Sequence, residues 1–177
     1  MTGPVVTVAA CSGTAHAPRP PTSRELPRWP WVAFADEDRD APGSLYSNAI
    51  ALWHKTGLTR PWNDPEADLN RALEGPDSTV IGATDGEALM ATVMVGHDGH
   101  RGWVYYLAAD PAAQGQGLGR KMMDASENWI LAQRIPKLQL MVRQDNAAAI
   151  GFYQKLGYTD AEVVVLGKRL TALRDER

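Results

Sequence analysis

The residues with the clearest chemical potential lie in a glycine-rich loop. Three glycines occur within five residues, at Gly115, Gly117 and Gly119. Glycine tolerates positive φ and lets a backbone approach a ligand without a clash from Cβ. The start of a helix adds unpaired N–H groups and a partial positive charge. A glycine loop that leads into a helix is therefore expected to bind an anion, most naturally a phosphate or pyrophosphate.

Two flanking patterns predict the elements that position this loop. Residues 103–109 are apolar or aromatic and end at Asp110-Pro111, which predicts a buried strand. After the loop, apolar residues recur at spacings of four, three, four and three, as on one face of a helix. These residues are Leu118, Met122, Ala125, Trp129 and Ala132.

Two common nucleotide-binding patterns do not fit the loop. A dinucleotide fingerprint needs G-x-G-x-x-G and an acid about twenty residues later. Counted from Gly115, the third glycine would fall at Arg120, and residues 135–137 contain no acid. A P-loop needs Ser or Thr after Gly-Lys, whereas this chain has Gly119-Arg-Lys-Met122. A nucleotide-binding protein of dehydrogenase type is therefore disfavoured.

The loop instead contains Gln114-x-x-Gly117-x-Gly119, and a second block follows from Asn146 to Tyr158. The loop resembles the Q/R-x-x-G-x-G/A pyrophosphate loop of the GNAT N-acetyltransferase superfamily, which binds acetyl-CoA. The second block resembles the superfamily's N-x-x-A-x-x-F-Y-x-K-x-G-F/Y signature. Its matching residues are Asn146, Ala149, Phe152, Tyr153, Lys155, Gly157 and Tyr158. The resemblance covers residues 31–170, with its specific residues between 103 and 158.

This resemblance implies an α/β fold of the GNAT acyl-CoA N-acyltransferase type. Its sheet is mixed, mostly antiparallel, flanked by helices and splayed between the fourth and fifth strands. Acetyl-CoA is the implied co-substrate, and no metal is implied. The expected cofactor-binding residues are Leu107, Ala108, Ala109, Gln114, Gly115, Gln116, Gly117, Leu118, Gly119, Arg120, Asn146 and Tyr153.

The resemblance makes Tyr153 the expected catalytic acid. A tyrosine with a pKa near 10 is protonated at neutral pH and can donate to the departing thiolate, whose thiol has a pKa near 8.5. Packing beside Phe152 in the core is the alternative role. Asn146 is expected to contact the cofactor, although an asparagine at this point is also a good helix N-cap.

The base that would deprotonate the amine is not identified by the sequence. Residues 102–109 lack the carboxylate that some superfamily members carry on the fourth strand. A water chain remains, as do His97, Asp98 and His100. We interpret these three residues as a hairpin tip rather than a metal site, because Asp-Gly is turn chemistry and further ligands are not apparent.

The expected reaction is direct attack of a primary amine on acetyl-CoA in a ternary complex. The amine belongs to a small molecule, a protein N-terminus or a lysine. Trp62 is a candidate for the mouth of the acceptor site, where an aromatic ring attracts cations. The neighbouring Asp64-Pro65 is better explained as a helix N-cap and first helical residue. A non-catalytic acyl-CoA-binding sensor or interaction module is the alternative, but a sensor has no need of a leaving-group acid at Tyr153.

The remaining elements follow from periodicity and turn signals. A helix is expected over residues 44–55 with Gly57 as its C-terminal cap, and Asp85-Gly86 predicts a hairpin turn. The strands are expected over residues 31–35, 78–84, 87–95, 103–109 and 138–142, with a final strand or bent pair over 158–170.

The length and the charge balance of the chain limit the number of domains and the kinds of partner that we expect. The chain of 177 residues corresponds to one domain, and 18 basic against 21 acidic residues give no case for nucleic acid or an anionic membrane. A single cysteine, Cys11, suits a reducing, cytoplasmic compartment, and a homodimer is compatible with the sequence.

The two ends of the chain differ in composition from the domain at residues 31–170. Residues 1–30 hold six of the twelve prolines, so we expect a disordered arm there. An export signal is disfavoured because no basic residue precedes the short apolar run. We expect a frayed tail at residues 171–177.

Overall fold

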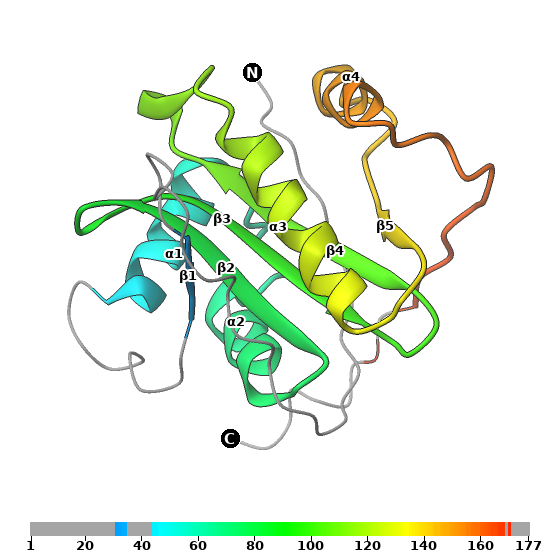
Figure 1. Cartoon of the computed structure of the whole chain (residues 1–177), viewed down its shortest axis with the longest axis horizontal. Coiled ribbons are helices and arrows are strands. Elements are labelled where there is room, and N and C mark those ends of the chain that lie inside the picture. The colour runs from blue at the N-terminus through cyan, green and yellow to red at the C-terminus, as the bar shows by residue number, and fades with distance from the viewer. Residues whose placement is uncertain (1–30, 35–43, 169, 171–177) are drawn as a thin grey trace.

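A mixed β-sheet forms the centre of the computed structural model, which describes residues 31–34, 44–168 and 170 (Figure 1). Within these residues the sheet has five strands in the order β1-β2-β3-β4-β5. Neighbouring strands are antiparallel, except that β4 and β5 are parallel. The strands are β1 (Trp31–Ala33), β2 (Ser78–Asp85), β3 (Ala88–His97), β4 (Gly102–Ala109) and β5 (Leu138–Leu140). The predicted α/β fold with a mixed, mostly antiparallel sheet is confirmed.

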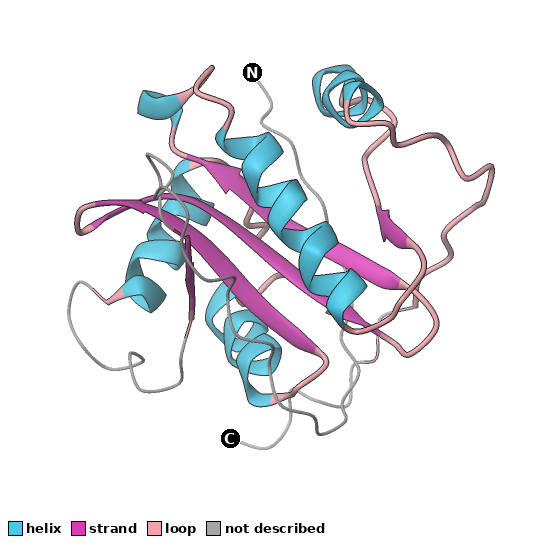
Figure 2. Ribbon diagram, in the orientation of Figure 1, coloured by secondary structure: helices cyan, strands magenta, loops and turns pink. Residues whose placement is uncertain are grey.

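Helices cover both faces of this sheet (Figures 1 and 2). Helices α1 (Leu45–Lys55) and α2 (Pro65–Glu74) lie on one face, and α3 (Leu118–Ala132) crosses the other. A short 3-10 helix, η2 (Pro111–Ala113), follows β4, and α4 (Ala147–Lys155) follows β5. Within the described part of the chain, every helix is too short or too polar to cross a membrane.

The helix starts are encoded by polar caps. Ser44, Asp64 and Asn146 are the N-caps of α1, α2 and α4. Asp64 Oδ1 accepts a hydrogen bond from Ala67 N at 3.0 Å, and Pro65 occupies the first helical position. The interpretation of Asp64-Pro65 as a helix start is confirmed. The other helices and strands described so far match their predictions with ends shifted by one or two residues, whereas the 3-10 helix η2 was not predicted.

The hydrophobic core lies between the sheet and helices α1, α2 and α3. Each of these elements contributes side chains with almost no exposed surface, which is the main favourable contribution to folding. They are Trp53, Leu69, Val80, Val93, Val95, Val104, Leu118, Met122, Met123 and Ile130.

Strand β5 pairs with β4 over only three residue pairs, from Gly102↔Leu138 to Val104↔Leu140. Beyond Val104, β4 continues to Ala109 while β5 has ended. The two strands therefore part in the middle of β4, and the predicted splay is confirmed. We call β1 to β4 with α1, α2 and α3 the scaffold, and residues 138–158, which contain β5 and α4, the arm.

A bulge bends β4 at the level where the strands part. Thr92 of β3 pairs with Ala108, and Met94 pairs with Tyr105, so that two residues of β4 oppose one of β3. Tyr106, inside the bulge, has a φ of 49°, which is rare for a residue with a large side chain. Bulges of this kind re-aim side chains near functional sites.

The expected final strand over residues 158–170 is wrong. Residues 158–168 form no strand, and the side chains from Val163 to Leu166 are 63–89% exposed. Glu162 has a φ of 53°, which interrupts the extended backbone. β-branched residues favour a strand only where a neighbouring strand and a packed face exist, and no described strand pairs with this segment. The expected disordered segment at 1–30, with Cys11, and the expected tail at 171–177 lie outside the described residues.

Candidate active site

A cavity of about 400 Å³ lies between the start of α3 and helix α4. Its walls come from the end of β4, the glycine loop, the first turn of α3 and the last turns of α4. The lining residues are Ala109, Ala113, Gln114, Gly115, Gly117, Leu118, Gly119, Arg120, Phe152, Lys155 and Leu156. The cavity therefore opens on the side where β4 and β5 part.

The glycine loop has the geometry of an anion site. Gly115 and Gly117 adopt φ angles of 81° and 77°, which residues with a Cβ rarely adopt. Gly117 is the N-cap of α3 and offers no side chain to the N–H groups of the first turn. These donors are left for an external acceptor, and Arg120 and Lys155 add positive charge to the same walls. The arrangement favours a phosphate or pyrophosphate group.

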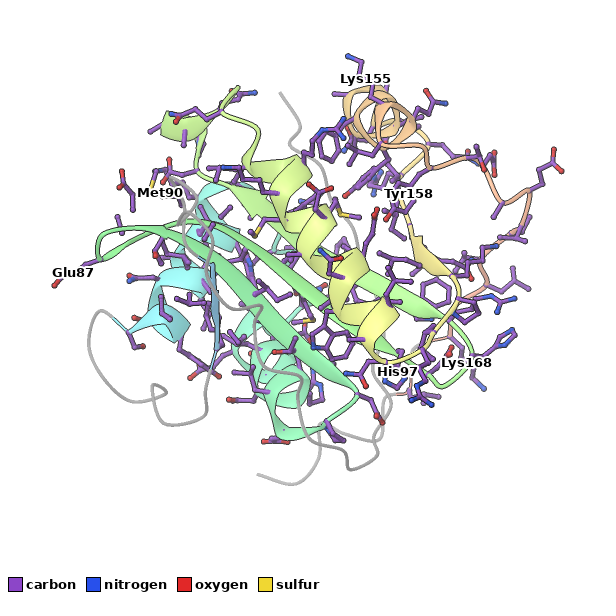
Figure 3. The ribbon with its side chains drawn as sticks, in the orientation of Figure 1. Glu87, Met90, His97, Lys155, Tyr158 and Lys168 are labelled. Atoms are coloured by element: carbon purple, nitrogen blue, oxygen red, sulfur yellow. The ribbon has the colours of Figure 1, made fainter. Side chains whose placement is uncertain are left out.

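Helix α4 forms the opposite wall, and side chains at its end contact α3. A Cβ at Gly119 would come within 3.0 Å of Phe152 Cζ, so the glycine makes room for the aromatic ring. Tyr158, which follows α4 and is labelled in Figure 3, donates a hydrogen bond to Glu127 Oε1 of α3 at 2.8 Å. These contacts set the width of the cavity.

Asp110 fixes the chain where it leaves β4 towards the glycine loop. Its two carboxylate oxygens accept hydrogen bonds from Lys55 Nζ at 2.9 and 2.8 Å, and Oδ1 also accepts one from Ala112 N at 2.9 Å. The lysine and then the backbone N–H lower the pKa of Asp110 below its usual value. The pair joins the end of α1 to the segment that precedes the cavity.

Tyr153 lies on α4 with its ring buried against two other aromatic rings. The ring centroids are 5.0 Å from Phe152 and 5.9 Å from Tyr158, both in edge-to-face geometry. The Tyr153 hydroxyl makes no hydrogen bond to a described residue, although the buried side-chain nitrogen and oxygen atoms of that part of the chain are all paired. The hydroxyl therefore has no described acceptor for its proton. Burial raises the pKa of Tyr153 well above its usual value, so the group is protonated at neutral pH.

The cavity brings together most of the residues predicted to bind the cofactor. Ala109, Gln114, Gly115, Gly117, Leu118, Gly119 and Arg120 line it, whereas Leu107, Ala108, Gln116, Asn146 and Tyr153 do not. Asn146 caps α4, because its Oδ1 accepts a hydrogen bond from Ala149 N at 3.1 Å. A contact between Asn146 and the cofactor stays a prediction.

Sequence reasoning missed Ala113 and three residues at the end of α4, namely Phe152, Lys155 and the C-cap residue Leu156. A signal was available for the latter three. Their spacing of three and four residues from Phe152 puts them on one side of a helix, and the second motif already predicted that helix. Ala113 carried no comparable signal.

The hairpin between β3 and β4, which carries His97, Asp98 and His100, lies away from the cavity. Figure 3 shows His97 at the end of the sheet opposite Lys155. The strand β4 spans roughly 20 Å from the hairpin to the cavity, at about 3.3 Å per residue. Among the described residues, no three His, Cys, Asp or Glu side chains gather as metal ligands would.

The carboxylate of Asp98 stabilises the turn of this hairpin by accepting hydrogen bonds. Its Oδ1 accepts hydrogen bonds from the N–H groups of Arg101 and His100 at 2.7 and 2.8 Å, and its Oδ2 accepts one from Trp103 Nε1 at 3.2 Å. These bonds, led by the one from Arg101, lower the pKa of Asp98 to about 2. Such a carboxylate is a weak base, so it is a poor candidate for deprotonating an amine.

A polar cluster occupies the other face of the sheet, beside the loop that precedes α2. Trp62 in this loop is 55% exposed. Asn63 Nδ2 donates a hydrogen bond to Tyr106 Oη at 3.2 Å, and Tyr106 Oη donates one to Asp68 Oδ2 at 2.7 Å. The bulge of β4 thus carries a tyrosine hydroxyl that is fixed to a carboxylate.

Comparison with known proteins identifies the family. The pattern of the Acetyltransferase (GNAT) family matches residues 47–158. Acetyltransferase ECA0875 of Pectobacterium atrosepticum is 42% identical over 131 residues, which cover 73% of this chain and 92% of that protein. The family pattern spans the glycine loop and α4.

Solved structures share the fold at much lower identity. An aminoglycoside acetyltransferase, meta-AAC0020, from an uncultured soil metagenomic sample, crystallised with trehalose, has a TM-score of 0.66 at 17% identity over 81% of this chain and 96% of its own. A predicted acetyltransferase from Clostridium acetobutylicum, solved with acetyl-CoA, has a TM-score of 0.61 at 18% identity over 78% and 96%. These structures support the fold alone. The family pattern and the relative at 42% identity show that the chain is an acyltransferase that belongs to the GNAT family of acetyltransferases.

Proposed function

We propose that the protein transfers the acetyl group of acetyl-CoA to the primary amine of a small molecule or peptide, by direct attack in a ternary complex. The observation that carries this proposal is the position of Tyr153. Tyr153 itself does not line the cavity, but its hydroxyl bonds to no described residue, and it lies on α4 next to Phe152, which does line the cavity opposite the glycine loop.

The residues around the cavity fit the pyrophosphate of CoA. The uncapped start of α3 supplies backbone N–H donors, and the positive φ angles of Gly115 and Gly117 orient the preceding loop. The side chains of Arg120 and Lys155 balance the negative charge. Gln114 and Gln116 flank the loop and are proposed to contact the same group.

The pantetheine arm is proposed to follow the free edge of β4. The pairing of β4 with β5 ends at Val104, and the backbone N–H and C=O groups from Leu107 to Ala109 on that edge are proposed to pair with an extended ligand. The segment from Leu107 to Ala109 offers this edge, and Ala109 also lines the cavity. Asn146 is proposed to contact the cofactor from the start of α4.

Bound acetyl-CoA supplies the acetyl thioester. In the transfer, a bond forms between the amine nitrogen and the carbonyl carbon, and the bond between that carbon and sulfur breaks. Tyr153 gives its proton to the sulfur and recovers one from water, and the nitrogen loses its proton to water, so that the amide and the thiol are the products. The glycine loop contributes by holding the pyrophosphate, so that the carbonyl stays beside the bulge of β4.

The test is Tyr153→Phe, which keeps the ring and its packing and removes the hydroxyl. Acetyl transfer is followed as CoA release with a panel of aminoglycosides, polyamines, amino acids and short peptides. Aminoglycosides are included because a solved neighbour is named for them. We expect kcat to fall by about 10²–10⁴, the usual contribution of a general acid. The Kd for acetyl-CoA should change little, because the bond is made chiefly in the transition state.

Tyr46→Phe is the matched control. Tyr46 is also a buried tyrosine, and its hydroxyl donates to the Glu66 carbonyl oxygen at 3.1 Å, on the other side of the sheet from the cavity. This variant should lose some stability but keep its kcat. A kcat of Tyr153→Phe within threefold of wild type would reject Tyr153 as the acid. Binding of acetyl-CoA without CoA release on any amine would favour a non-catalytic binding role instead.

A further inference from the structure

The bulge of β4 presents a second tyrosine hydroxyl, on the face of the sheet covered by α1 and α2. The ring of Tyr106 stacks on that of Trp53, with centroids 4.1 Å apart and planes inclined by 22°. Trp53 Nε1 donates a hydrogen bond to Thr92 Oγ1 at 2.8 Å, which in turn lies 3.4 Å from the Tyr106 carbonyl oxygen. These contacts hold the residue in its unfavourable φ of 49°, as strained residues at functional sites are held by their surroundings.

The Tyr106 hydroxyl is fixed as a donor to one carboxylate. It donates to Asp68 Oδ2 at 2.7 Å and accepts from Asn63 Nδ2 at 3.2 Å. Asp68 also pairs through Oδ1 with Arg71, and its side chain is 27% exposed. A proton delivered to Asp68 can therefore pass to solvent. Burial and then the bond to Asp68 raise the pKa of Tyr106 far above its usual value, so the phenol passes protons on without becoming an anion.

The position of Tyr106 on β4 is suited to contact with the amine that attacks the thioester. Tyr106 lies at the level where β4 has lost its β5 partner, and Ala109, three residues further along the same strand, lines the cofactor cavity. Three residues of strand correspond to roughly 10 Å. The cavity lies between α3 and α4, whereas the buried Tyr106 hydroxyl faces Asp68 of α2, whose side chain is 27% exposed, so the acceptor is inferred to reach the bulge beside Asp68.

We propose that Tyr106 is the catalytic residue that accepts the proton of the acceptor amine, and that Asp68 positions it and receives the proton that it passes on. This inference rests on the proposed acetyl transfer. It assigns the role of base to Tyr106 in the bulge and to Asp68 on α2. The hairpin residues His97, Asp98 and His100, at the other end of β4, are then not needed as the base.

The proton movements balance. A protonated amine has no lone pair for attack, so its proton first passes to Tyr106 Oη while the tyrosine's own proton passes to Asp68 and then to water. When the bond from nitrogen to carbon forms, the nitrogen loses a second proton, which follows the same route through Tyr106 and Asp68 to water. The bond from carbon to sulfur breaks, and Tyr153 protonates the sulfur. The charged groups that face the Tyr106 hydroxyl are Asp68 and Arg71 of α2, while Trp53 of α1, Thr92 of β3 and Asn63 are neutral.

The test uses two small acceptors, propylamine and hydroxylamine. Propylamine is a cation at neutral pH and needs a base, whereas hydroxylamine is largely uncharged. CoA release is measured for wild type, Tyr106→Phe and Asp68→Asn. We expect kcat/KM with propylamine to fall by about 10²-fold or more in both variants, and kcat/KM with hydroxylamine to fall by no more than about tenfold. The loss with propylamine should shrink as the pH rises, because more of the amine is then free.

Three comparisons make the result decisive. Tyr46→Phe, which also removes a hydrogen bond to α2, should leave both rates within threefold. Tyr153→Phe should lower both rates equally, because both acceptors displace the same thiolate; if it lowers neither, the acid assigned above is wrong. Equal losses with the two acceptors in Tyr106→Phe and Asp68→Asn, or losses below threefold, would overturn the base assignment alone. A wild-type protein that releases no CoA with these two acceptors or with any amine of the panel would overturn both proposals.

Discussion

The scaffold and the arm are built by different means. In the scaffold, β2 and β3 pair over eight residue pairs, and side chains such as Trp53 and Val93 are fully buried. The arm is joined to β4 by three pairs, and its apolar side chains are mostly half-buried, apart from Ala149 and Tyr153. Burial of apolar surface stabilises the scaffold by itself. The arm contributes less to stability, and its value lies in the cavity wall that it forms.

The largest expected effect comes from truncating a leucine in each region. Leu69 on α2 is completely buried, so Leu69→Ala should lower the free energy of unfolding by about 2–5 kcal/mol. Leu156 of the arm is half-buried and lines the cavity, so Leu156→Ala should lower it by about 1 kcal/mol or less but weaken acetyl-CoA binding. Urea unfolding and calorimetric titration measure the two quantities. Equal losses of stability would contradict the division into scaffold and arm.

The second effect concerns the glycine loop at the start of α3, which faces helix α4 of the arm across the cavity. Gly117 has a φ of 77°, and a Cβ there costs about 1–2 kcal/mol or forces the loop to turn. Gly117→Ala should therefore weaken acetyl-CoA binding by at least tenfold, about 1.4 kcal/mol. A Cβ added at Gly151 on α4 would meet no neighbouring atom within 4 Å, and this glycine has no positive φ, so Gly151→Ala is the matched control and should keep wild-type affinity. Titration of folded Gly117→Ala with unchanged Kd would show that the loop does not need its glycine.

The smallest expected effect compares one ion pair from each region. Lys55→Met should lower the free energy of unfolding by about 0.2–1 kcal/mol at neutral pH, because Lys55 holds the pKa of Asp110 low. A lowered pKa stabilises the fold above the usual aspartate value of 3.8, and this contribution is lost as the pH falls through the folded-state pKa. The difference between variant and wild type should thus vanish in acid. Arg143→Met, which breaks the exposed Arg143–Asp145 pair of the arm, should show no difference at any pH.

The elements that the sequence predicted well are those with strong local signals. Asp64-Pro65 begins a helix in the order that capping requires, and the alternating spacing after Leu118 specified α3. The glycine loop was found because positive φ at Gly115 and Gly117 needs glycine itself. Side-chain chemistry within a few residues decides these features, so sequence alone contains them.

The features that the sequence missed depend on residues far apart in the chain. Nothing in Val104-Tyr-Tyr-Leu107 signals that Tyr106 takes a positive φ, because the bulge results from pairing with β3. The bond between Asp68 and Tyr106 joins residues 38 positions apart, so no local pattern could predict it. The run of valines before Leu166 predicted a strand, but a strand also needs a neighbour, and local propensity cannot supply one.

The three residue pairs between β4 and β5 have a consequence for the energy landscape of the protein. A segment held by so few pairs is expected to open as a cooperative unit of its own, at a lower free energy than global unfolding. A ligand that spans α3 and α4 closes this unit by mass action, and at a concentration of about 100 Kd it raises the opening free energy by about 2.7 kcal/mol. The amide protons of α4 would then exchange with solvent about a hundredfold more slowly, while those of β2 and β3 would already be protected in the free protein. The proposed catalytic tyrosine of the arm would thus become rigid only when its substrate is bound.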